Sequence, residues 1–171
     1  MNFKSFSFAP EIIQALDELN YHTLTPIQRA AIPAVRKGKD VLASAQTGTG
    51  KTAAFALPII QKLVESELST TNAPHALVLA PTRELAEQIA NNFRDFAKHT
   101  SLKVVSLFGG VSTAGQANAL KEGVDIVVAT PGRLFDHIRL GNLSLASVKH
   151  LVLDEADRML DMGFIEDMQN V

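Results

Sequence analysis

The sequence predicts an α/β fold: a mostly parallel sheet with helices on both faces. Five short runs are apolar at consecutive positions, as strands buried on both faces are, and they occupy residues 40–45, 76–80, 103–108, 125–130 and 150–155. Amphipathic segments separate these runs, and such alternation of strand and helix is typical of βαβ units in a parallel sheet. Ligands of such sheets bind beyond the carboxyl ends of the strands.

The helices are predicted from their caps and their periodicity. A first helix is expected over Pro10–Leu19, and Asn20 suits the left-handed backbone that ends it. Thr25-Pro26-Ile27-Gln28 has the S/T-x-x-E/Q pattern of a capping box with proline at the first helical position, so a second helix should begin there. Another should begin near Lys51. The strongest amphipathic face is formed by Leu85, Ile89, Phe93 and Phe96.

Composition indicates one ordinary globular domain. The 171 residues contain 46% hydrophobic and 20% charged residues, enough for a core without metals or disulfides. There is no cysteine and no apolar run near the ~20 residues of a membrane span, so the expected compartment is the cytoplasm. The polar stretch 66–75 is predicted to be a surface loop.

Net charge does not decide whether the partner is a nucleic acid. The whole chain has a formal charge of −2, but residues 154–171 hold six acidic side chains and one basic side chain. The remainder is therefore mildly positive and would not repel phosphates, although no basic tail indicates nucleic acid either.

A phosphate-binding loop is predicted where the first apolar run passes into a helix. Residues 45–52 fit G-x-x-x-x-G-K-[ST] except that alanine holds the first position; they are Ala45, Gln46, Thr47, Gly48, Thr49, Gly50, Lys51 and Thr52. The glycines let backbone N–H groups turn inward at a helix N-terminus. Lys51 can reach the outer phosphates and the Thr52 hydroxyl can bind Mg²⁺. The alternative is a glycine-rich structural turn.

An acidic pair at the end of the last apolar run complements this loop. Asp154 falls at the carboxyl end of the expected strand, where it can bind Mg²⁺ directly or through water. Glu155 follows and could polarise an attacking water. The alternative for both carboxylates is a cap on the next helix. Lys51, Asp154 and Glu155 are therefore the candidate catalytic residues.

Residues 154–157 read D-E-A-D, and the chain resembles the first RecA-like domain of a DEAD-box RNA helicase from about Phe3 to Val171. The family's motifs appear in order as TPIQ (25–28), ASAQTGTGKT (43–52), PTRELA (81–86), the glycine pair 109–110 and TPGR (130–133). Alanine at position 45 is common in that family. The residues within and around these motifs are most similar to those of bacterial members of the RhlE type. The resemblance implies one N-terminal RecA-like ATP-binding domain over 1–171, with its Q-motif region at 3–28.

The resemblance also implies roles for individual residues. Gln28 would read adenine through its carboxamide, with Tyr21 stacked on the base, although without the other motifs a helix cap is the preferred interpretation of Gln28. The RNA strand would be gripped by Pro81, Thr82, Arg83, Gly109, Gly110, Thr130, Pro131, Gly132 and Arg133. All of these follow an expected strand or open a helix, which places them at one sheet edge. Each group alone also fits a cap or a turn.

The expected function is binding and Mg²⁺-dependent hydrolysis of ATP coupled to separation of RNA strands, with single-stranded or duplex RNA as partner and no membrane. Two alternatives are a P-loop ATPase that acts on DNA or in transport, and a non-catalytic module that binds nucleotide or RNA. A transporter ATPase should show LSGGQ, which this sequence lacks. The five histidines show no metal-ligand spacing.

The resemblance further implies that the chain ends before the family's Ser-Ala-Thr strand and lacks its second RecA-like domain, which would be a partner within the full-length chain. In RecA-like sheets the Ser-Ala-Thr strand lies between the phosphate-loop strand and the DEAD strand. Without it, residues 40–45 and 150–155 should flank a gap with unpaired backbone groups.

Overall fold

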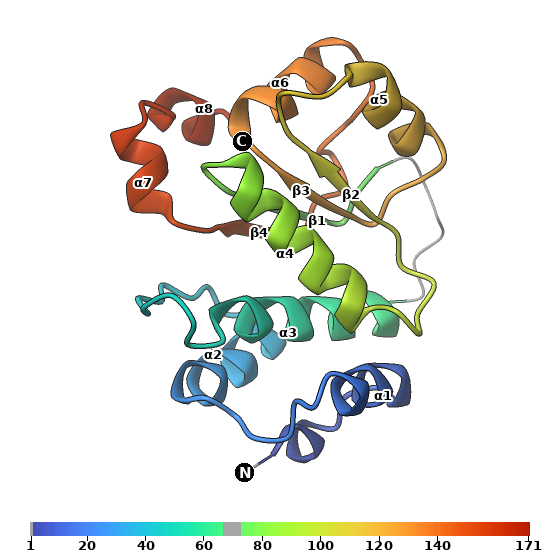
Figure 1. Cartoon of the computed structure of the whole chain (residues 1–171), viewed down its shortest axis with the longest axis vertical. Helices are drawn as coiled ribbons and strands as arrows, with labels where there is room; N and C mark the ends of the chain where they lie inside the picture. Colours follow the sequence, from blue (N-terminus) through green and yellow to red (C-terminus); the bar gives the residue numbers. More distant parts are fainter. Residues whose placement is uncertain (1, 67–72) are drawn as a thin grey trace. The chain divides into compact units, whose positions relative to one another are not determined.

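The computed structural model describes residues 2–66 and 73–171, so most of the predicted surface loop at 66–75 lies outside the described residues. The chain begins with a 3₁₀ helix, Phe3–Phe6. The α-helices are α1 (Pro10–Glu18), α2 (Pro26–Arg36), α3 (Lys51–Glu65), α4 (Arg83–Phe96), α5 (Thr113–Lys121), α6 (Pro131–Arg139), α7 (Ala156–Asp161) and α8 (Ile165–Gln169). The strands are β1 (Ala76–Leu79), β2 (Val104–Leu107), β3 (Ile126–Ala129) and β4 (His150–Leu153), all labelled in Figure 1.

The chain divides into two compact units. The first contains Met1–Leu68 and Asn92–Leu102, and the second contains Ser69–Asn91 and Lys103–Val171. The boundary falls within α4. The phosphate loop belongs to the first unit, whereas the sheet and the DEAD sequence belong to the second.

The second unit is built on a four-stranded parallel sheet in the order β2-β3-β1-β4. The register is regular: Ala76 lies beside Ile126 on one side and beside His150 on the other. Residues on both faces of β1 and β3 are fully buried, as predicted from their consecutive apolar positions. Four of the five predicted strands are confirmed, and helices surround the sheet.

The prediction of a strand at residues 40–45 is wrong. Residues 40–45 have no regular secondary structure, and the sheet contains no strand from this segment. Val41 is 42% exposed and Leu42 is fully exposed. The physical reason is the lack of a partner, because a strand is stable only where neighbouring strands satisfy its backbone N–H and C=O groups. In the described part of the chain, β4 pairs with β1 alone and nothing pairs with 40–45.

One hydrophobic core covers a face of this sheet. Odd-numbered strand residues such as Leu77, Leu107 and Val127 pack with Leu120 from α5 and Leu134 from α6. Met159 from α7 joins the same core, and Phe164 and Met168 pack against it. These contacts anchor α5, α6 and α7, so each loop that precedes one of these helices ends at a fixed position.

The helices of the first unit follow their predicted caps. α1 ends one residue before the predicted boundary, and Asn20 has the expected left-handed backbone with φ +59°. α2 begins at Pro26 behind the Thr25 N-cap, and α3 begins at Lys51. In α4, which belongs partly to each unit, Ile89, Phe93 and Phe96 are buried as predicted, while Leu85 is half-buried.

Candidate functional site

The phosphate loop of the first unit ends in two glycines with left-handed backbone. Gly48 has φ +83° and Gly50 has φ +79°, and Gly50 is the N-cap of α3. The Thr49 hydroxyl donates to the Gln46 carbonyl at 2.6 Å and closes the turn. The N–H groups of Gly48 and Gly50 donate to no other group in the described parts of the chain. Free N–H groups before a 15-residue helix are suited to an anion such as phosphate.

Gln28 is the buried link between α2 and this loop. Its side chain is 2% exposed. The Thr25 N–H donates to Gln28 Oε1 at 2.9 Å, and Gln28 Nε2 donates to the Gly50 carbonyl at 3.2 Å. Thr25 and Gln28 are arranged as a capping box, but the Thr25 hydroxyl makes no capping hydrogen bond of good geometry. Gln28 therefore caps α2, and the same carboxamide links this helix to the phosphate loop.

Gly50 is required by this contact as well as by its backbone angle. A Cβ at this position would lie 2.4 Å from Gln28 Nε2 and 3.1 Å from the Thr25 hydroxyl oxygen. At Gly48, by contrast, a Cβ would meet nothing within 4 Å. A side chain at position 50 would have to displace Gln28.

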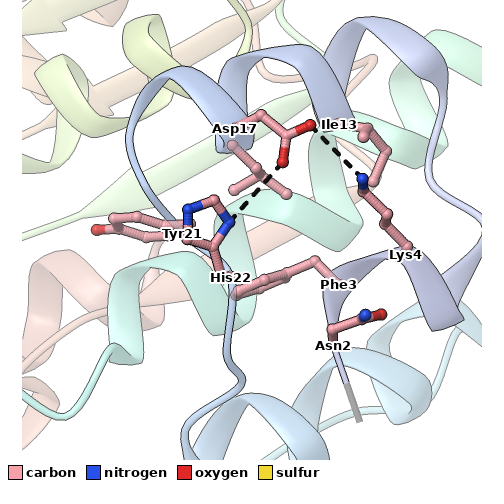
Figure 2. Close-up of a pocket in the computed structure, with 8 residues that line it drawn as sticks. Asn2, Phe3, Lys4, Ile13, Asp17, Tyr21 and His22 are labelled. Atoms are coloured by element: carbon pink, nitrogen blue, oxygen red, sulfur yellow. Dashed lines mark ion pairs between the residues drawn. The ribbon is translucent and has the colours of Figure 1, made fainter.

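Tyr21, the residue expected to stack on a base, lies among other aromatic rings. Its ring centroid is 6.2 Å from that of Phe3 and 5.7 Å from that of Phe96, the latter edge-on. Tyr21 is 39% exposed and Phe3 is buried. Figure 2 shows these two rings at a pocket together with Asp17, which pairs with Lys4 at 3.8 Å and with His22 at 3.9 Å. Packing against Phe3 and Phe96 fixes the Tyr21 ring and leaves part of it open to solvent.

In the second unit, Asp154 and Glu155 lie directly beyond β4. The Asp154 N–H donates to the Leu79 carbonyl at 2.9 Å, which continues the β1–β4 pairing by one residue. Asp154 is 4% exposed, and its Oδ1 accepts the Glu155 N–H at 3.0 Å. A buried carboxylate at a strand end suits Mg²⁺, which proteins hold through one or two carboxylates while waters and substrate phosphates fill the remaining positions.

Glu155 has an unusual backbone for a glutamate. Its φ is +51°, in the left-handed region, and it is the N-cap of α7. Its carboxylate pairs with Arg158 one turn along at 3.4 Å. Non-glycine residues in this conformation cluster at functional sites, because the surrounding structure must hold them there.

The motifs expected to grip RNA converge on the loop after β2. Arg83, the first residue of α4, places its guanidinium 4.8 Å from the centre of the Phe108 ring. Gly110 has φ +80°, and a Cβ there would lie 3.0 Å from Arg83 Nη1. Thr82 caps α4, since its hydroxyl accepts the Leu85 N–H at 3.3 Å. Two of the three predicted RNA motifs are thus in contact through Phe108, which the sequence did not indicate.

The third motif reaches the same loop from α6. The Thr130 N–H donates to the Leu107 carbonyl at 2.9 Å, and Pro131 opens the helix. Arg133 Nη1 donates to the Val111 carbonyl at 3.0 Å and to Gln116 Oε1 at 3.2 Å. The Arg133 side chain is only 13% exposed. It therefore holds the loop, whereas Arg83 and Gly132 are exposed at the surface.

A buried polar network stands behind this loop and was missed from the sequence. Gln116, His137 and Asn142 are joined by hydrogen bonds of 2.9 and 3.2 Å, and His137 is fully buried. Burial lowers the pKa of His137 below its usual 6.5, Arg133 lowers it further, and Asp136 acts in the opposite direction. Its one sequence signal was the position of His137 three residues after Leu134, on the buried stripe of α6.

The structure also bears on metals and membranes. Among residues 2–66 and 73–171, no group of three or more histidine or acidic side chains is arranged to hold a metal ion. Within the same ranges, no helix has the length and apolar character needed to span a membrane. The candidate nucleotide residues are divided between the units: Lys51 and Thr52 lie in the first, Asp154 and Glu155 in the second.

Comparison with known proteins identifies the family. The model of the DEAD/DEAH box helicase family matches residues 25–171, so the chain belongs to this family. It is 51% identical over 170 residues to the ATP-dependent RNA helicase DeaD of Escherichia coli K12, a match that covers 99% of this chain and 26% of the relative. It is 50% identical over 171 residues to DeaD of Buchnera aphidicola from Acyrthosiphon pisum, covering 98% of this chain and 28% of the relative.

The DeaD protein of Klebsiella pneumoniae is 49% identical over 170 residues. The chain thus spans about a quarter of the length of these curated relatives. The family predicted from the D-E-A-D sequence is confirmed. The finer expectation of an RhlE-type member stays a prediction, since these relatives carry the name DeaD.

Proposed function

We propose that the chain is the N-terminal ATP-binding domain of an ATP-dependent RNA helicase, working with a second RecA-like domain of the same protein in the cytoplasm. The observation that carries the proposal is the 51% identity across 99% of the chain to a protein named as such a helicase. The alternatives, a DNA-directed ATPase and a non-catalytic module, lack a comparable observation in their favour.

The proposed nucleotide-binding roles follow the family's motifs, residue by residue. Lys51 and the N–H groups at the start of α3 would bind the phosphates, with Thr52 and Asp154 holding Mg²⁺, partly through water. When bound there, Mg²⁺ would supply positive charge next to the phosphates. Glu155 would accept a proton from the attacking water. These roles are supported by the open N–H groups of the loop and by the burial of Asp154 at the end of β4.

Adenine recognition by Gln28 is compatible with its role as a helix cap. A carboxamide has two N–H donors and two acceptor lone pairs. Gln28 uses one donor for the Gly50 carbonyl and one lone pair for the Thr25 N–H. One donor and one acceptor remain, which is the pair that the N7 and N6 atoms of adenine require. The solvent-facing part of the Tyr21 ring would stack on the base.

The RNA strand would lie along the loop after β2. Arg83 is exposed and is oriented by the Phe108 ring, so it would contact phosphates, as would the backbone around Gly109, Gly110 and Gly132. Pro81, Thr82, Thr130, Pro131 and Arg133 would shape this surface. Contacts of this kind fix the backbone of a nucleic acid and carry no base specificity.

Two variants of the full-length protein test the proposed chemistry. Lys51→Ala should abolish productive ATP binding, because the outer phosphates lose their point charge. Glu155→Gln should keep ATP and RNA binding while hydrolysis falls at least about 100-fold, since only proton abstraction is lost. Asp161→Asn, at the exposed end of α7, removes one carboxylate without touching the site and should hydrolyse normally. Normal RNA-stimulated hydrolysis by folded Glu155→Gln would disprove the assignment.

A further inference from the structure

The loop that contains Gly109 and Gly110 is held by both carbonyls that flank the glycine pair. The Phe108 carbonyl accepts from Gln116 Nε2 at 2.9 Å. The Val111 carbonyl accepts from Arg133 Nη1 at 3.0 Å. Gln116 and Arg133 are themselves joined at 3.2 Å. The two side chains therefore form one clamp across the base of the loop, with a contact on each side of the glycines.

The chemistry of Gln116 fixes the direction of every hydrogen bond in this clamp. A carbonyl can only accept, so the atom facing Phe108 must be the amide nitrogen, and the Gln116 oxygen must be the acceptor that faces Arg133. His137 Nε2 lies 2.9 Å from this same oxygen. His137 must then carry its proton on Nε2. Its Nδ1, 3.2 Å from Asn142 Nδ2, is left as an acceptor for the Asn142 amide.

Burial makes this chain of bonds rigid. Gln116 is 8% exposed and His137 is fully buried, and a buried polar side chain that loses a partner is costly because no water replaces it. The order Asn142 to His137 to Gln116 to Phe108 therefore has one favoured orientation. Gln116, on α5, transmits the position of α6 to the backbone immediately before Gly109.

We propose that Gln116 is a positioning residue for RNA binding: through Arg133 and His137 it holds the Gly109–Gly110 loop in the conformation that accepts an RNA backbone. The inference rests on the proposed function. A loop ordered before binding loses less conformational entropy when the ligand arrives. Release of the Phe108 carbonyl should thus weaken RNA binding and leave the nucleotide loop, which lies in the first unit, unaffected.

The test compares two buried glutamines in the full-length protein. Gln116→Met keeps the side-chain length and removes all three polar contacts, to the Phe108 carbonyl, Arg133 and His137. The matched control is Gln61→Met on α3: Gln61 is 4% exposed, accepts from Ala9 N–H at 2.7 Å and donates to Glu65 at 2.7 Å. The probe is a fluorescein-labelled single-stranded oligouridylate, with anisotropy read in the presence of a non-hydrolysable ATP analogue. KM values for RNA and for ATP are measured alongside.

We expect Gln116→Met to weaken oligouridylate binding roughly tenfold and to raise the KM for RNA with little change in the KM for ATP. Gln61→Met should lose stability but keep its affinity for the oligouridylate. Equal oligouridylate affinity in folded Gln116→Met and wild type would overturn the inference, and so would parallel changes in both KM values. A wild-type protein that fails to bind the probe would instead contradict the proposed function.

A second variant decides the matter if Gln116→Met does not fold. Asn142 is half-buried at the far end of the chain of bonds, and Asn142→Ala removes the donor to His137 Nδ1 without reaching the loop. It should weaken oligouridylate binding about twofold, with the His137 Nε2–H form less dominant in ¹⁵N spectra of the imidazole. Unchanged affinity in this variant, or a wild-type His137 protonated on Nδ1, would overturn the inference.

Discussion

Gly50 and Gln28 depend on each other more closely than either motif suggests alone. Gly50 provides the left-handed N-cap of α3, and its carbonyl accepts from Gln28 Nε2 at 3.2 Å. A motif pattern records the glycine and the glutamine as separate signals 22 positions apart. The structure joins them in one contact, so substitutions at Gly50 should also destabilise the start of α2, which Gln28 caps.

The first residue-scale prediction compares two glycines of the phosphate loop. Gly50→Ala and Gly48→Ala both place alanine at φ near +80°, which costs about 1–2 kcal/mol each. Only Gly50→Ala also displaces Gln28. Its free energy of unfolding should therefore fall by about 1 kcal/mol more. Urea unfolding of both variants measures the difference, and equal losses would contradict the coupling.

The second residue-scale prediction concerns pH. The pKa of buried His137 is lowered from 6.5 in the folded state, so the unfolded chain takes up the proton more readily. The stability that depends on neutral His137 is fully present above pH 6.5 and is lost as the pH falls from there toward the folded pKa. Urea unfolding across this range should show a smaller loss for His137→Gln than for wild type.

An identical slope in His137→Gln and wild type would show that His137 does not contribute.

At the scale of elements, the local sequence determined most boundaries. β1, β2, β3 and β4 are short runs whose partners all lie within the described chain, so their apolar patterns were sufficient. The caps of α2 and α3 depend on residues within a turn of each helix start, and these were predicted too. The segment 40–45 has an equally apolar pattern, but a strand also needs a neighbour, which no local pattern can supply.

The network behind the glycine loop was unpredictable for a similar reason. Gln116 and His137 are 21 positions apart, and neither belongs to a motif. A glutamine in the middle of a helix usually faces solvent. Its burial follows from the packing of α5 and α6 against the sheet, which is a property of the folded unit.

The next prediction concerns whether residues 40–45 are paired with a strand in the 171-residue chain. Leu42 is fully exposed, so Leu42→Ser should change the free energy of unfolding by no more than about 0.5 kcal/mol. Leu79→Ser, at a fully buried strand position, should cost several kcal/mol (roughly 2–5). Amides of 41–45 should exchange quickly with solvent, and those of 76–79 slowly. Slow exchange in both segments would mean that 40–45 is paired.

At the scale of the whole molecule, the chain contributes about a quarter of the length of its DeaD relatives. It carries the phosphate loop, the DEAD residues and the Gly109–Gly110 loop. In comparable phosphoryl-transfer sites an arginine supplied from another domain contributes about 10³–10⁵ in rate. The proposed second RecA-like domain would provide such residues, so hydrolysis of ATP should be measured on the full-length protein.

The most direct measurement is the rate of ATP hydrolysis by the full-length protein with single-stranded RNA, with single-stranded DNA and with no nucleic acid, with Glu155→Gln as the catalytic control. An RNA-dependent ATPase should hydrolyse ATP quickly only with RNA, and Glu155→Gln should be inactive in all three. Equal stimulation by DNA would indicate a DNA-directed ATPase. Absence of hydrolysis under every condition, in a protein that still binds ATP, would indicate a non-catalytic module and contradict the account.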